Sequence, residues 1–76
     1  MQNEQLIKMA NQIGDFYESF PDKKQAQMDI AGHLNKFWAI SMRQQIAQYV
    51  KDNAGNAAAS GLHALVAAAI SKHVEI

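Results

Sequence analysis

Three histidines and one pair of neighbouring carboxylates are the side chains of this sequence best suited to metal binding or proton transfer. His33, His63 and His73 form no pair four residues apart, and none has a Cys or Asp at the spacing of a zinc site. His33 flanks a predicted buried stripe and His73 continues one, which favours packing roles. Asp15 and Glu18 lie on the solvated side of a predicted helix and lack a pocket. We therefore predict no metal site.

The other groups that could catalyse a reaction are scattered in the same way. The serines fall at predicted helix ends or on polar faces, without a nucleophile-elbow motif. The glycines lack the spacing of a dinucleotide-binding or phosphate-binding loop. Cysteine is absent, which excludes disulfides and thiolate ligands and fits a reducing compartment. We therefore expect no catalytic or cofactor-binding residue and no enzymatic activity.

Helical periodicity runs through most of the chain and predicts an all-α fold, a small four-helix domain spanning residues 1–76. Pro21 ends the first helix near Ser19. Asp22 and Ser41 each precede a glutamine by three residues, which is the capping-box spacing, and Ser60 is a possible cap of the last helix. The first three helices should be antiparallel neighbours, and the fourth, after a small-residue loop, docks across them or onto another chain. The predicted helices are residues 3–19, 22–37, 41–52 and 61–73.

Apolar residues at three- and four-residue spacing define the predicted core. A chain of 76 residues buries only about 60% of the surface that its unfolded form exposes, and such a core rarely supplies more than ~3–5 kcal/mol. A partner chain is the leading additional support. The predicted core positions are Leu6, Met9, Ala10, Ile13, Phe16, Tyr17 and Phe20; Ala26, Ile30, Leu34 and Phe37; Met42, Ile46, Tyr49 and Val50; and Leu62, Val66, Ala69 and Ile70.

Two surfaces are not explained by a monomer. Trp38 falls on the edge of the second helix's stripe, next to a nearly uncharged face, and residues 61–71 contain no charged side chain. Such surfaces are typical of partner contacts. An alternative stays open: Trp38 seals the bundle against the third helix, small residues admit a neighbouring helix, and the alanines simply favour helix formation. The predicted interface is Met28, Ala31, Asn35, Trp38, Ala64, Leu65 and Ala68.

Charge gives no partner class, because seven basic residues balance seven acidic ones. The longest apolar stretch, ALVAAAI, is far shorter than the ~20 residues that span a bilayer, so we expect a cytoplasmic protein with no membrane contact. The segment DIAGHLNKFW resembles the start of a DNA-recognition helix. The nearby lysines are offset by Asp22 and Asp29, however, so nucleic-acid binding is the weaker alternative.

The segment KMANQIGDFYESFPDKKQAQMDIAGHLNKFWAISMRQQI, followed after a loop by GLHALVAAAI, resembles the delta subunit family of NAD-dependent formate dehydrogenase. The resemblance covers nearly the whole chain. Its most distinctive pieces are MANQI at residues 9–13, the Pro21-Asp22 turn, the spacing of His33, Phe37 and Trp38, and the pair Met42-Arg43.

The resemblance implies a small, helical, non-catalytic chain without a redox centre. It implies association with a cytoplasmic complex whose catalytic (alpha) subunit holds a molybdenum or tungsten pterin cofactor and iron–sulfur clusters. That complex oxidises formate to carbon dioxide and passes electrons through flavin to NAD, and this chain would support assembly, maturation or stability of the catalytic subunit. The residues alone predict a partner-binding helical module, and a self-associating helical protein unrelated to formate is the alternative.

The sequence departs from the family's pattern at two places. The family carries Asp-Pro just after the Phe-Trp pair and again after the later Gly-Leu, whereas this chain has Ala39-Ile40 and His63-Ala64. Because Asp-Pro caps and starts a helix, we expect Ser41 and Ser60 to take over the capping. If the family's Asp residues contact the catalytic subunit, the affinity of this chain for that subunit is altered.

Overall fold

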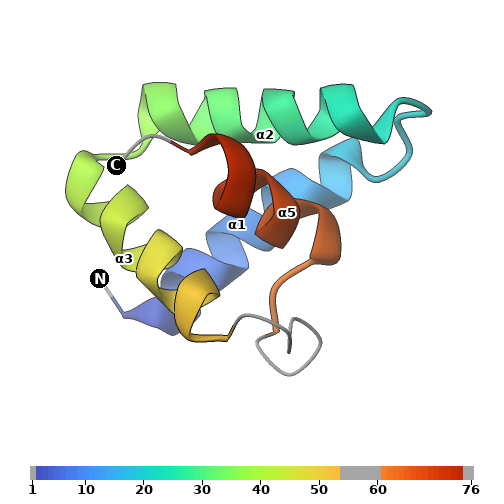
Figure 1. Ribbon diagram of the computed structural model, residues 1–76. Helices are drawn as coiled ribbons and strands as arrows, with labels where there is room; N and C mark the ends of the chain where they lie inside the picture. The colour runs from blue at the N-terminus through green and yellow to red at the C-terminus, as the bar shows by residue number, and fades with distance from the viewer. Residues whose placement is uncertain (1, 54–60, 75–76) are drawn as a thin grey trace.

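The computed structural model describes residues 2–53 and 61–74 of the chain. These residues form four α-helices and no strand, which confirms the predicted all-α class. α1 rises toward the right of Figure 1, α2 returns above it, and α3 descends on the left. α5 lies below α2 and in front of α1. The helices are α1 (Asn3–Tyr17), α2 (Lys23–Phe37), α3 (Ile40–Asp52) and α5 (Ala64–His73).

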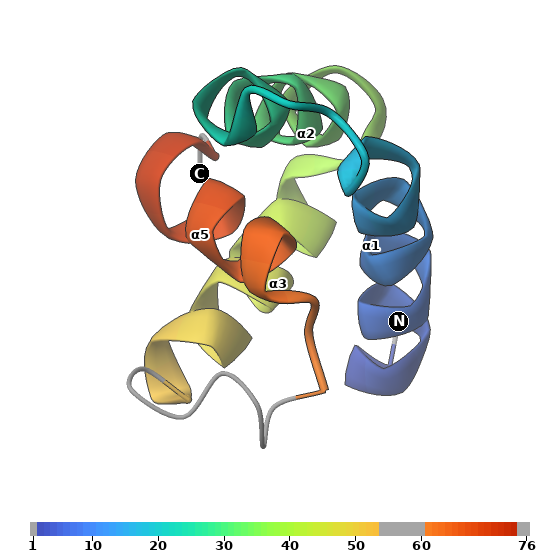
Figure 2. The same cartoon turned by 90° about the vertical axis from the view of Figure 1, so that its right-hand side faces the viewer.

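All four helices contribute to one hydrophobic core. Figure 2 shows α2 lying over the other three helices, with α1 and α5 on opposite sides. The predicted core positions of the C-terminal segment are confirmed, since Leu62, Val66, Ala69 and Ile70 are buried. Two predictions are wrong: Phe16 is 68% exposed and Phe37 is 72% exposed. The other buried apolar side chains are Leu6, Ala10, Ala26, Ile30, Ala31, Leu34, Trp38 and Ile46.

The start of α2 is capped as predicted, because Asp22 Oδ1 accepts the Gln25 backbone N–H at 3.1 Å. The prediction for α3 is wrong: Ala39 is the N-cap, and Ser41 lies exposed within the first turn. The Ala39 carbonyl already accepts the backbone N–H groups of Met42 and Arg43. The helix therefore begins before Ser41 could cap it, and no side chain takes that role.

α5 begins later than predicted. Gly61 has φ +80°, a left-handed conformation that interrupts a helix, and the first helical residue is Ala64. Ser60, the possible cap named above, lies outside the described residues. His63 is the N-cap, and its Nδ1 accepts the Leu65 N–H at 3.2 Å. Histidine thus performs the capping at the position where the family pattern has aspartate.

α1 holds the start of α5 through one amide side chain. Asn11 Nδ2 donates to the Gly61 carbonyl at 2.9 Å, and Asn11 Oδ1 accepts the His63 N–H at 2.8 Å. One turn further along α1, Gly14 is buried against the side chains of His63 and Val66. A Cβ at Gly14 would lie 2.4 Å from Val66 Cγ2, so the close approach of the two helices requires glycine there.

Replacing Asp22 with alanine should lower the free energy of unfolding by about 1 kcal/mol, because it removes the acceptor that caps α2. Urea denaturation followed by circular dichroism measures the difference. Ser41→Ala is the matched control, since Ser41 shares the capping-box spacing but caps nothing, and its effect should stay within about 0.5 kcal/mol. Equal losses from both substitutions would contradict this assignment of the caps.

Candidate functional site

The sequence pattern places Phe37 in the buried stripe and leaves open whether Trp38 seals the bundle; in the structure Trp38 is buried and Phe37 faces solvent. Trp38 is 6% exposed, whereas Phe37 is 72% exposed. α2 ends at Phe37, and Trp38 has extended backbone while its N–H still donates to the Leu34 carbonyl at 3.0 Å. The buried side chains step by four residues from Ala26 through Ile30 and Leu34 to Trp38, so the stripe winds away from Phe37. The indole is therefore a core group and is not displayed to a partner.

α5 covers the face of α2 that lacked a predicted neighbour. Ala31 is 1% exposed, so its side chain is also enclosed within the chain. Asn35 Nδ2 donates to the His73 carbonyl at 3.3 Å and joins the C-terminal ends of the two helices. α2 and α5 pack against each other more extensively than any other pair of helices, although a Cβ at Gly32 would meet no atom of α5 within 4 Å. Neither Trp38 nor Ala31 then requires a partner to explain its burial.

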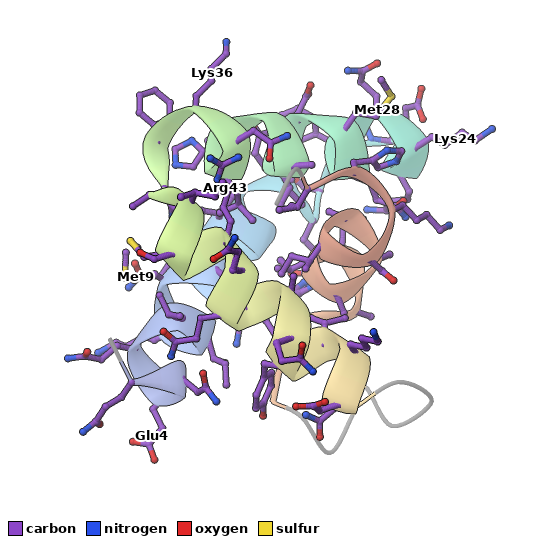
Figure 3. The ribbon with its side chains drawn as sticks, turned by 60° about the vertical axis from the view of Figure 1, so that its left-hand side comes forward. Glu4, Met9, Lys24, Met28, Lys36 and Arg43 are labelled. Carbon is purple, nitrogen blue, oxygen red and sulfur yellow. The ribbon has the colours of Figure 1, made fainter. Side chains whose placement is uncertain are left out.

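The other residues of the predicted interface lie nearer the surface. Met28 is 53% exposed and Ala64 is exposed, while Asn35, Leu65 and Ala68 are half-buried. Figure 3 shows Met28 near Lys24 at one end of α2, and Lys36 near the other end. The structure therefore divides the predicted interface into two buried, three half-buried and two exposed residues.

A surface that the sequence did not reveal lies where α2 turns into α3. Phe37 is 72% exposed and Ile40 is 53% exposed. The His33 imidazole packs on the Phe37 ring, with centroids 4.8 Å apart. We call His33, Phe37 and Ile40 the corner patch. The spacing of Phe37 from Ile30 and Leu34 also fits a buried position, so the sequence could not show that the Phe37 ring faces solvent. In the structure α2 ends at Phe37, and Trp38, in extended backbone, takes the buried position instead.

A second exposed aromatic group marks the end of α1. Phe16 is 68% exposed, and its ring lies 5.0 Å from Tyr17 and 5.8 Å from Phe20, measured between centroids. Asp15 and Glu18 flank this group along the chain and are both exposed. The chain thus displays two aromatic surfaces, and carboxylates border this one.

Charge differs between the two aromatic surfaces. Residues 30–51 contain no Asp or Glu, so the segment that carries the corner patch contributes only basic charges. Asp29, the nearest preceding acid along α2, accepts a hydrogen bond from Gln25 Nε2 at 2.9 Å. Figure 3 shows the basic residues Lys36 and Arg43 near the C-terminal end of α2, whereas Glu4 lies on the far side of the molecule.

His63 lies close to Asp15 and Glu18, a grouping that sequence spacing did not show. The three side chains offer ligand atoms within 4.8 Å of one another, and His63 Nε2 is 3.6 Å from Glu18 Oε2. His63 Nδ1 already accepts the Leu65 N–H. A neutral imidazole that accepts at Nδ1 carries its proton at Nε2, which faces Glu18. Neither ring nitrogen of such an imidazole has a free lone pair for a metal ion, so the arrangement favours a hydrogen-bonded helix start over a metal site.

Comparison with known proteins identifies one family. The model described as NADH-dependant formate dehydrogenase delta subunit FdsD matches residues 5–70 of the 76-residue chain. No curated protein and no solved structure gives a significant match. Within the described residues, no helix is long and apolar enough to span a membrane. The matched range includes the corner patch, the Asn11 and Gly14 contacts with α5, and most of the core.

Proposed function

The chain belongs to the NADH-dependent formate dehydrogenase delta subunit family, and from that premise we propose that it is a non-catalytic accessory subunit of a cytoplasmic NAD-dependent formate dehydrogenase. Its role is to support assembly, maturation or stability of the catalytic subunit, which carries a molybdenum or tungsten pterin cofactor. The observation that carries the proposal is the family match over residues 5–70, which spans α2 and α3 completely and most of α1 and α5.

The placement of the titratable side chains supports a non-catalytic role. His33 packs on Phe37, His63 caps α5, and His73 lies exposed in the last turn of α5. Proton transfer catalysis needs an acid or base positioned within hydrogen-bond reach of a bound substrate. A hollow on α3 is lined by Gln44, Ala47, Gln48 and Lys51, which bring amides and one amine but no histidine or carboxylate.

Exposed apolar side chains support a role in binding another subunit. Phe16, Met28, Phe37 and Ile40 are all more than half exposed, although they are large and apolar. Aromatic residues, including phenylalanine, and methionine are enriched in protein–protein interfaces relative to the rest of the surface. A chain that exposes several large apolar side chains while its own core is closed is suited to association.

The proposal predicts that omitting this chain lowers the yield of active formate dehydrogenase several-fold. The test co-expresses the remaining subunits with and without the chain and measures formate-dependent NAD reduction and bound molybdenum or tungsten per catalytic subunit. Loss of both quantities indicates a role before or during cofactor insertion, because an unloaded catalytic subunit cannot turn over. The purified chain alone should reduce no NAD with formate.

A tagged copy of the chain distinguishes a lasting subunit from a factor that leaves after assembly. A lasting subunit purifies with the cofactor-loaded complex, whereas a transient factor purifies with the unloaded catalytic subunit. Equal activity, equal metal content and no co-purification in either state would disprove the proposed function. A tight homodimer without affinity for the complex would support the self-associating alternative instead.

A further inference from the structure

The corner patch has the composition of an interface centre. Phe37 projects from the last turn of α2 with 72% of its surface exposed, and Ile40 from the first turn of α3 with 53% exposed. The His33 ring supports Phe37 on one side. Contact with His33 restrains the Phe37 ring before binding, so less side-chain freedom is lost when the ring enters a pocket.

The charged side chains that the segment from residue 30 to residue 51 contributes are all basic. Lys36, adjacent to Phe37, is exposed and is the main charge of the patch, whereas Arg43, one turn into α3, is half-buried. The segment from residue 30 to residue 51 contains no Asp or Glu, so Lys36 has no carboxylate next to it along α2 or α3. Figure 3 shows both basic side chains at the corner-patch end of α2. A partner surface with carboxylates around an apolar pocket complements this arrangement.

We propose that the corner patch is the docking surface of this chain, with Phe37 entering an apolar pocket that is bordered by carboxylates on another subunit. The identity of that subunit rests on the proposed function. A standard interface takes ~800 Å² from each partner, which is about one sixth of the 4759 Å² that this chain exposes. The corner patch with its basic rim forms the centre of such an area.

A second copy of the chain is the poorer occupant. A two-fold contact brings the same surface of both copies together, so each Lys36 would approach the basic rim of the other copy. Juxtaposed like charges weaken such a contact. The aromatic group around Phe16 has acidic neighbours instead, so it differs from the corner patch in charge while matching it in exposure. Phe16 is therefore the matched control.

The test measures binding of the full chain to formate dehydrogenase assembled without it, by biolayer interferometry at low and high salt. Phe37→Ser should weaken binding at least tenfold, because it removes the apolar anchor. Lys36→Glu should weaken binding several-fold at low salt and reduce its salt dependence, since that charge contributes to attraction. Phe16→Ser should change affinity by less than twofold. Thermal melting of each variant checks that the fold is intact.

Each alternative result has a definite meaning. If Phe16→Ser weakens binding and Phe37→Ser does not, the docking surface is wrong while the proposed function stands. If all three variants bind like the original chain, the corner patch is likewise excluded. If the original chain does not bind the complex, both proposals fail. Sedimentation showing a dimer that Phe37→Ser dissociates would assign the patch to a second copy and overturn the proposal.

Discussion

Replacing Trp38 with alanine is expected to leave the chain largely unfolded. Trp38 is 6% exposed and belongs to the core cluster that joins all four helices. Truncating a buried tryptophan typically costs about 3–5 kcal/mol, and a core in a chain this short rarely supplies more than ~3–5 kcal/mol in total. Far-ultraviolet circular dichroism of the purified variant measures the helical content that is lost.

The neighbouring aromatic residue provides the control. Phe37→Ala removes a ring of similar size that is 72% exposed, so the free energy of unfolding should change by about 0.5 kcal/mol or less. A stable Trp38→Ala variant that lost only its binding to the formate dehydrogenase complex would show that the indole serves an interface. Loss of binding that follows loss of helical structure assigns the indole to the core.

Gly14→Ala is expected to lower the free energy of unfolding by about 1–2 kcal/mol. The added Cβ would meet Val66 Cγ2 at 2.4 Å and His63 Cγ at 3.2 Å, and Val66 is fully buried. Overpacking of this kind costs about 1–3 kcal/mol, and the gain of about 0.5–1 kcal/mol from removing a helical glycine offsets part of it. Urea denaturation of the purified chain measures the net change.

Gly32→Ala is the matched control, because Gly32 also lies inside a helix but has no atom within 4 Å of an added Cβ. There the gain in helix propensity acts alone and should stabilise the chain by about 0.5–1 kcal/mol. The two substitutions are chemically identical and are expected to have opposite signs. Stabilisation by both would show that α1 and α5 separate readily at Gly14.

Local patterns predicted the helices because their causes are local. Pro21 and Asp22 separate α1 from α2 within a few residues, and the three-four spacing of apolar residues places Leu62, Val66 and Ile70 in the core. The same reasoning failed at helix ends. A helical wheel admits both three-residue and four-residue steps, so it could not decide whether Phe37 or Trp38 continues the buried stripe.

The site was less predictable than the fold. Burial of Trp38 depends on an extended residue after α2, and exposure of Phe37 and Ile40 depends on the turn between two helices. The grouping of His63 with Glu18 joins residues far apart in sequence, which periodicity does not report. The match over residues 5–70 identifies the family, whereas the exposure of the corner patch could be seen only from the packing of the four helices.

The Asn11 contact has a consequence for how fast the chain folds. Asn11 and His63 are 52 positions apart, and closing a segment of that length costs conformational entropy before any contact compensates for it. α5 contains only 10 residues, and isolated helices of that length are marginal in water. α5 is therefore stabilised mainly by its packing against α1 and α2. We expect refolding to be slower than in bundles whose contacts are mostly between sequence neighbours.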